Sequence, residues 1–132
     1  YTDTMHTHQL QIPDHLIKVG HYQIEDGYHC MQELLDESFG LFSAVVAAND
    51  SMAFGAITAI RERGLSIPDD IAVVGGDGVH PLEYSTPSLT TFEVDNFQMG
   101  KIGTDALFEI MSGTRVPPFP LIPTRLRVRA SS

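Results

Sequence analysis

The sequence predicts an α/β fold with a mostly parallel sheet, and two observations support this prediction. Short apolar runs typical of strands alternate with stretches that carry apolar residues at helical spacing. Proline, glycine and helix-capping residues stand between them, as expected of short connections. Because strands and helices alternate, we expect parallel strands joined by helical crossovers.

The strand segments are short and are separated by turn residues. The expected strands are residues 16–20, 44–48, 71–75 and 89–94, followed by an extended closing stretch over 121–129. The second and third are continuous apolar runs, which is typical of strands covered on both faces. We therefore expect both faces of these two strands to be covered.

Three helices are expected between these strands, over residues 25–37, 52–63 and about 96–111. Apolar residues at i, i+3, i+6 and i+7 from Tyr28 mark one buried face of the first helix. Residues 49–51 (Asn-Asp-Ser) are all good N-cap residues for the second, and Gly64 is well placed to end it.

Length and charge limit the classes of function. The 132 residues suit one domain, and 8 Lys and Arg against 17 Asp and Glu give a formal net charge of −9. Such a chain repels the phosphates of nucleic acid, so we expect no direct DNA contact. It has no apolar run of about 20 residues, so we expect no membrane partner. It begins at Tyr1 without an initiator methionine or a signal-peptide pattern, and we expect it to be a fragment of a longer protein.

Polar and aromatic residues follow the expected strands at their carboxyl ends, where open α/β sheets bind ligands. His21 and Tyr22 follow the first strand, Asn49 and Asp50 the second, and Asp77 the third. A carboxylate and an amide can bond the hydroxyl groups of a ligand, while an aromatic ring covers its apolar face. The sequence therefore predicts a site for a polyhydroxylated small molecule.

Each of these residues also has a purely structural interpretation. Asn49 and Asp50 can simply cap the following helix instead of binding a ligand. Asp77 can bind loop amides, and Tyr22 can belong to the core. Only the convergence of the residues at one edge favours the binding site.

Other chemistries find little support. A dinucleotide-binding G-x-G-x-x-G motif would need glycine at position 81, which is Pro81, and no G-x-S-x-G motif is present. Cys30 has no evident activating base, and the histidines are scattered. We therefore predict no catalytic residue, no cofactor and no metal site. We interpret Arg125, Arg127 and Arg129 as a solvated strand face.

Four motifs occur in order along most of the chain. Residues 47–56 read AANDSMAFGA, residues 67–77 read IPDDIAVVGGD, residues 87–91 read PSLTT, and Met99-Gly100 precedes Ala106-Leu107 in one helix. In this order they resemble the corresponding motifs of the lactose- and galactose-repressor family of transcriptional regulators.

The resemblance implies one lobe of a two-lobed effector-binding core related to periplasmic sugar-binding proteins. In this family Asn49 and Asp77 match positions that hydrogen-bond the effector, which we expect to be a sugar, and Tyr22 matches an aromatic residue that packs on it. We expect the family's DNA-binding head, hinge helix and first lobe to lie outside this chain. The helix within 95–113 is expected to pack on that absent lobe. DNA contact would then occur only through the missing head, in a cytoplasmic repressor.

The resemblance also implies a homodimer. Its interface would include Phe54 and Ile57 on the helix 52–63, and Leu82 and Tyr84 in the following loop. Gly76 departs from the family pattern, because an aromatic residue is usual there, and we expect a roomier wall at this position.

The alternative function is a periplasmic sugar-binding protein of a transport system, which shares the sheet and the Asn-Asp and Val-Val-Gly-x-Asp features. The Leu-Thr-Thr segment and the Met-Gly helix favour the repressor.

Overall fold

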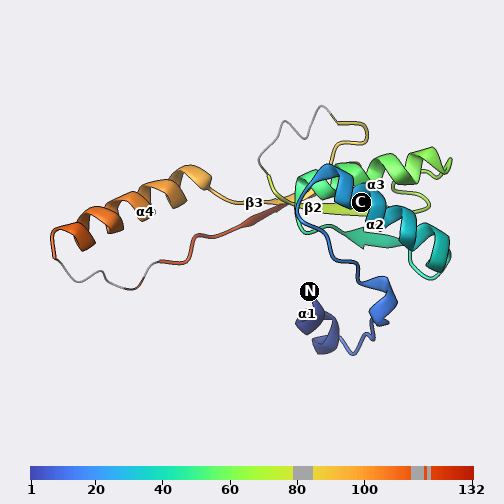
Figure 1. Cartoon of the computed structure of the whole chain (residues 1–132), viewed down its shortest axis with the longest axis horizontal. Coiled ribbons are helices and arrows are strands. Elements are labelled where there is room, and N and C mark those ends of the chain that lie inside the picture. Colours follow the sequence, from blue (N-terminus) through green and yellow to red (C-terminus); the bar gives the residue numbers. More distant parts are fainter. Residues whose placement is uncertain (79–84, 114–117, 119) are drawn as a thin grey trace.

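The part of the chain that the structure describes forms a four-stranded sheet in the order β1-β2-β3-β4 (Figure 1). This computed structural model describes residues 1–132 except 79–84, 114–117 and 119. The strands β1 (Ala44–Val46), β2 (Ala72–Asp77) and β3 (Thr90–Glu93) are parallel, and β4 (Arg125–Arg127) is antiparallel to β3. The predicted α/β class with a mostly parallel sheet is confirmed.

Two helices form the core with one face of this sheet. α3 (Asp50–Glu62) packs on β2, and α2 (Ile24–Ser38) packs on α3. The two helices approach closely, because a Cβ atom at Gly55 would lie only 2.0 Å from the carbonyl oxygen of Ile24. The largest apolar side chains buried between these layers are Met31, Ile60, Ile71, Val73 and Leu89.

The strand predicted over residues 16–20 does not form. The N-terminal segment contains α1 (Thr2–Thr7) and the short 3₁₀ helix η1 (Asp14–Leu16), and then runs alongside α2 without joining the sheet. The Lys18 ammonium lies 3.2 Å from Glu33 and 2.7 Å from Glu37, both on α2. The prediction is wrong because side-chain bonds to α2, rather than a backbone ladder with β1, hold this segment.

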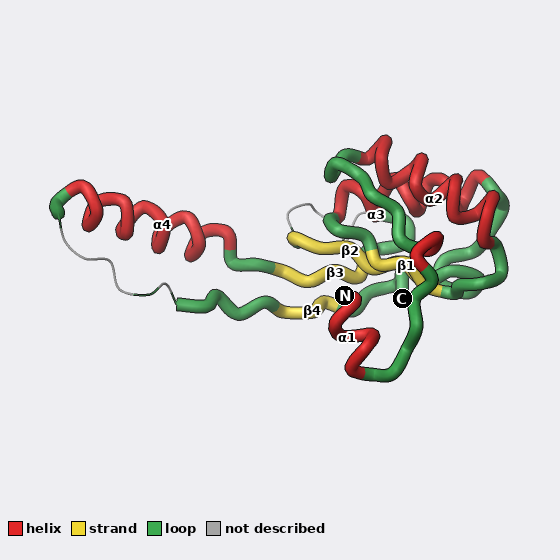
Figure 2. Tube along the Cα trace, turned by 60° about the horizontal axis from the view of Figure 1, so that its bottom comes forward, coloured by secondary structure: helices red, strands yellow, loops and turns green. Residues whose placement is uncertain are grey.

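β1 was expected to be covered on both faces, and this is also wrong. α2 and α3 lie on the same side of the sheet (Figure 2). On the other face Val46 is 56% exposed, and Phe92 and Leu126 are also exposed. The register pairs Gly76 with Phe92 and Phe92 with Leu126, so these positions share that face.

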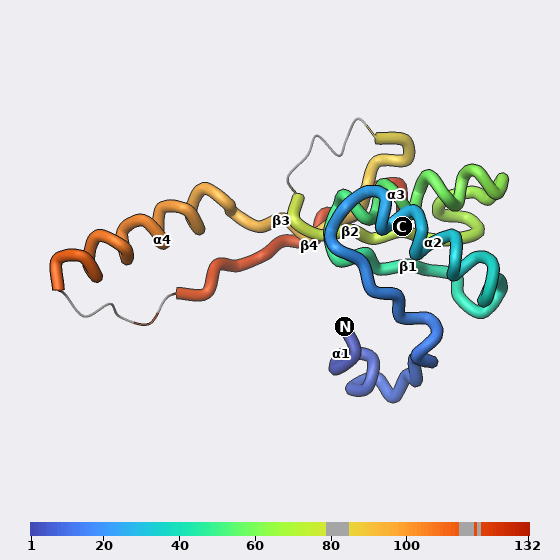
Figure 3. Tube along the Cα trace, viewed as in Figure 1, coloured from blue at the N-terminus to red at the C-terminus, as the bar shows by residue number. Residues whose placement is uncertain are grey.

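The helix α4 (Asn96–Met111) projects away from the sheet at the end of the β3–β4 ribbon (Figures 1 and 3). Asp95 caps it, with its Oδ1 atom accepting a hydrogen bond of 2.8 Å from the Gln98 N–H. Its bounds agree with the sequence prediction. Large apolar side chains are exposed along it, among them Phe97, Met99, Leu107, Phe108, Ile110 and Met111.

The residues predicted for a dimer interface do not all lie at the surface. Ile57 is only 6% exposed and belongs to the core, so its expected display at the surface is wrong. It points toward the sheet because it lies one turn from Ala53, on the buried face of α3. Phe54 is partly buried against the same core. Leu82 and Tyr84 lie outside the described residues.

In the part of the chain that the structure describes, none of the helices has the length and hydropathy required of a membrane span.

Candidate functional site

The carboxyl ends of β1 and β2 carry the predicted site residues. Asn49 follows β1 and begins α3, while Asp77 is the last residue of β2. Tyr22 reaches the same edge from the segment before α2, where the Asn49 Nδ2 atom donates a 3.0 Å hydrogen bond to the Tyr22 carbonyl oxygen. The structure thus brings Tyr22 and Asn49 into direct contact.

Asn49 is the N-cap of α3. Its Oδ1 atom accepts a 2.9 Å hydrogen bond from the Met52 N–H. The capping interpretation of the sequence is therefore confirmed. Because an amide side chain carries two N–H bonds and two acceptor lone pairs, capping and the bond to Tyr22 leave one of each for a ligand.

Tyr22 lies in a turn that its neighbours hold in an uncommon conformation. Its φ is +68°, in the left-handed region, and the Asp26 carboxylate accepts hydrogen bonds from the N–H groups of His21 and Gln23 on either side. These two bonds lower the pKa of Asp26. The Tyr22 side chain is 63% exposed, so the alternative that it belongs to the core is wrong.

Asp77 also has an unusual backbone, with φ at +101°. Its side chain is half-buried. Burial raises the pKa of Asp77, and the negative charge of Asp50 raises it further. The backbone conformation at this position costs free energy, so the surrounding structure must hold it in place.

Asp50, which the sequence offered as a helix cap or a ligand group, has a buried structural role that the sequence did not indicate. It is 0% exposed, and its carboxylate accepts hydrogen bonds from the Thr91 hydroxyl at 2.7 Å and from the Gly78 N–H at 2.8 Å. No pattern local to Asp50 could show this, because the partners lie 28 and 41 residues away along the chain.

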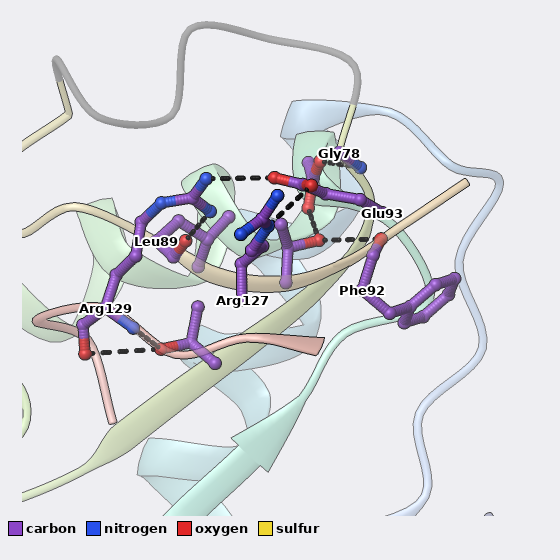
Figure 4. A network of polar contacts seen from close by, with 9 residues as sticks. Gly78, Leu89, Phe92, Glu93, Arg127 and Arg129 are labelled. Atoms are coloured by element: carbon purple, nitrogen blue, oxygen red, sulfur yellow. Dashed lines mark hydrogen bonds and ion pairs between the residues drawn. The ribbon is translucent and has the colours of Figure 1, made fainter. Parts of the chain in front are cut away.

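The wall expected to be roomier at Gly76 is occupied by an aromatic ring from the next strand. A Cβ atom at Gly76 would lie 2.5 Å from two ring atoms of Phe92. In Figure 4 the Phe92 ring points away from the polar network of the neighbouring residues. The space beside Gly76 is thus filled by a ring from β3.

Two of the three arginines predicted to be solvated form a network with Glu93 (Figure 4). The Arg127 Nε atom lies 2.8 Å and the Arg129 guanidinium 3.1 Å from the Glu93 carboxylate. Arg129 also donates to the Leu89 carbonyl. Bonding and charge from Arg127 and then Arg129 lower the pKa of Glu93. The interpretation as a solvated face is wrong for Arg129, whose side chain is only 20% exposed.

A cavity of about 680 Å³ lies beside the site, between the N-terminal segment, α2 and β1. Tyr22 lines it, but the other lining residues are mostly apolar, including Val19, Leu34 and Val46. Asn49 and Asp77 do not line it. Because a polyhydroxylated ligand needs converging polar groups, the carboxyl edge of the sheet fits such a ligand better than this cavity.

Among the described residues, no three His, Cys, Asp or Glu side chains gather closely enough to hold a metal ion.

Comparison with known proteins identifies the family. A family model described as periplasmic binding protein-like domain matches residues 1–132. The chain belongs to this family. The HTH-type transcriptional repressor MelR of Bacillus subtilis is 36% identical to this periplasmic binding protein-like domain over 119 residues, covering 90% of the chain and 34% of the repressor.

Solved structures agree with this assignment. The transcriptional regulator CelR in complex with cellobiose superposes with a TM-score of 0.89 at 28% identity, covering 100% of this chain and 40% of CelR. The lac repressor dimer bound to operator gives a TM-score of 0.84 at 29% identity, covering 99% of this chain and 45% of the lac repressor chain. The resemblance to the lactose- and galactose-repressor family is confirmed. The chain spans about a third of the length of MelR and less than half of the two solved regulators.

Proposed function

We propose that this chain is the effector-sensing lobe of a bacterial transcriptional repressor. In this proposal the effector is a small polyhydroxylated metabolite, most simply a sugar. The observation that carries it is the gathering of an exposed aromatic residue, an amide and a carboxylate at one edge of the sheet in a relative of repressors. CelR, which superposes on the whole chain, was solved with cellobiose.

Each proposed ligand-binding residue has a distinct role. Asp77 accepts hydrogen bonds from ligand hydroxyls, and Asn49 supplies one donor and one acceptor beyond those that its cap uses. Tyr22 lays its exposed ring on the apolar face of the ligand. None of these roles requires a reaction, which agrees with relatives that are regulators rather than enzymes.

The test is a titration of the chain with millimolar cellobiose and with other mono- and disaccharides. Amide NMR spectra recorded during the titration report which residues contact the saccharide. We expect shifts at Tyr22, Asn49 and Asp77. Affinity should be weak, because one lobe encloses only one side of a ligand and pockets normally bury most of the ligand surface.

Asp77→Ala should reduce the affinity at least about tenfold, because a hydrogen bond to a charged group contributes about 1.5–3 kcal/mol. Asp36→Ala is a matched control, since it removes a carboxylate on α2 that is not part of the site. Saccharide shifts confined to the apolar cavity, or submillimolar binding that Asp77→Ala leaves unchanged, would contradict the proposed site.

We further propose that the whole protein is a cytoplasmic homodimer that contacts DNA through a separate head and folds α4 onto another lobe. The lac repressor that superposes on this chain is a dimer on its operator. Exposed apolar side chains on α4 and the half-buried Phe54 offer surfaces for these contacts. A helix-turn-helix sequence upstream of Tyr1 in the gene would support the repressor. A signal peptide there would instead support the periplasmic transport alternative.

A further inference from the structure

Asp50 carries a charge that the structure has removed from water. Its side chain is 0% exposed, at the first turn of α3. A buried carboxylate is costly unless hydrogen bonds and favourable dipoles compensate it. The helix N-terminus provides part of this compensation. The rest comes from two specific donors on other elements.

These donors tie three elements together at the site. Oδ1 accepts from the Thr91 hydroxyl of β3 at 2.7 Å, and Oδ2 accepts from the Gly78 N–H after β2 at 2.8 Å. The space around the carboxylate is closely packed, because a Cβ atom at Gly75 would lie 2.5 Å from Oδ1. The carboxylate is therefore fixed in position by its partners and by the backbone of β2.

The Gly78 N–H belongs to the peptide group that follows Asp77. Asp77 holds φ at +101°, which a non-glycine residue adopts only when its surroundings impose it. Holding the next amide fixes the orientation of this peptide plane. The direction of the Asp77 side chain follows from its backbone, so the bond to Gly78 also determines where that side chain points.

We propose that Asp50 is a positioning residue for the effector site: its buried carboxylate, oriented by Thr91, holds the Asp77–Gly78 turn so that Asp77 faces the ligand. The ligand role of Asp77 in this statement rests on the proposed function. Asp50 itself does not need to touch the effector. Thr91 on β3 takes part in this positioning, because its hydroxyl group holds the Asp50 carboxylate.

A matched pair of variants at Thr91 tests this proposal. Thr91→Val keeps the shape of the side chain but removes the hydroxyl, whereas Thr91→Ser keeps the hydroxyl. We expect Thr91→Val to speed hydrogen exchange of the Gly78 amide about tenfold or more, because a hydrogen bond to a buried charge is lost beside it. The three-bond coupling between the amide and α protons of Asp77, which reports φ, should change as well. Thr91→Ser should restore both values.

Asp50→Asn is the second variant. We choose it over Asp50→Ala, because Asp50→Ala would leave the Gly78 N–H and the buried Thr91 hydroxyl without their partner and would disfavour folding. The Asn oxygen can accept from the Gly78 N–H, and its amide can donate to the Thr91 hydroxyl oxygen. Both readouts at Asp77 and Gly78 should therefore stay close to wild type. The pKa of Asp77 should fall, because the negative charge that helps to raise it is gone.

The outcomes separate this proposal from the proposed function. If Thr91→Val lowers the unfolding midpoint but leaves the Asp77 coupling and Gly78 exchange unchanged, Asp50 is a structural group only and the positioning role is wrong. If both readouts change and Thr91→Ser restores them, the positioning role stands. The positioning role then stands even if cellobiose and the other saccharides shift no amide signal of the wild-type chain. Such a titration result counts only against the sugar-binding function.

Discussion

Asn49→Ala is expected to weaken the start of α3 as well as the site. The substitution removes the cap on the Met52 N–H and the bond to the Tyr22 carbonyl. Loss of an N-cap costs about 1 kcal/mol. The second bond is between exposed groups that water can satisfy, so it adds at most about 1 kcal/mol. A total of about 1–2 kcal/mol is small beside the typical 5–15 kcal/mol stability of a domain, so the chain should still fold.

Hydrogen exchange at the Met52 amide measures this effect where it arises. A loss of about 1–2 kcal/mol corresponds to roughly five- to thirtyfold faster exchange. Asn49→Asp is the matched control, because a carboxylate accepts the Met52 N–H well at a helix N-terminus but has no N–H for Tyr22. We expect Asn49→Asp to keep the protection of Met52 while losing the tie to Tyr22. Equal exchange at Met52 in wild type and Asn49→Ala would refute the capping argument.

Three further predictions concern packing, acid stability and association. Gly76→Ala should lower the free energy of unfolding by about 1–3 kcal/mol, because the new methyl group overpacks against the Phe92 ring. Thermal unfolding measures this loss, and adding Phe92→Leu to the same chain should restore part of the lost stability. An unchanged unfolding midpoint in Gly76→Ala would count against the contact. The pKa of Asp26 is lower in the folded chain than its ordinary value of 3.8. The stabilisation that Asp26 gives to the turn before α2 is therefore fully present above pH 3.8, and it is lost as the pH falls through the lower pKa of the folded state. The amide shifts of that turn should follow this acid transition, and Asp26→Asn should abolish it. Light scattering at micromolar concentration should detect a dimer or larger species that Phe54→Asp or Leu107→Asp weakens, whereas a monomer insensitive to both would argue against apolar association.

The helices α2, α3 and α4 could be predicted from sequence because their signals are local. The caps at Asn49 and Asp95 each bond an N–H three residues away, so the residues that define these helix starts are close in sequence. The buried stripe of α2 likewise repeats every three to four residues, as its buried residues Met31, Leu34 and Leu35 show.

Strand pairing and the facing of residues were harder to predict because they depend on distant partners. Residues 16–20 have a strand-like composition, yet their contacts go to α2 through Lys18 and not to the edge of β1. α3 is apolar around much of its circumference, so its sequence did not reveal that Ile57 lies inside while Phe54 is half-buried. In both cases the pattern identified an apolar segment but not the element that covers it.

The sequence posed a choice between capping and ligand binding at Asn49 and Asp50, and the observed cap at Asn49 is compatible with its proposed ligand role. Asn49 caps α3 with one atom of its amide and holds Tyr22 with another, and this fixes the side chain in a single orientation at the edge of the sheet. A binding group that is already fixed loses less entropy when a ligand arrives. In the proposed site Asp50, one residue later, holds the Asp77–Gly78 turn through the Gly78 N–H. The cap and the first residue of α3 thus contact both Tyr22 and the Asp77–Gly78 turn, and under the proposed function this is why a capping sequence and a binding sequence coincide here.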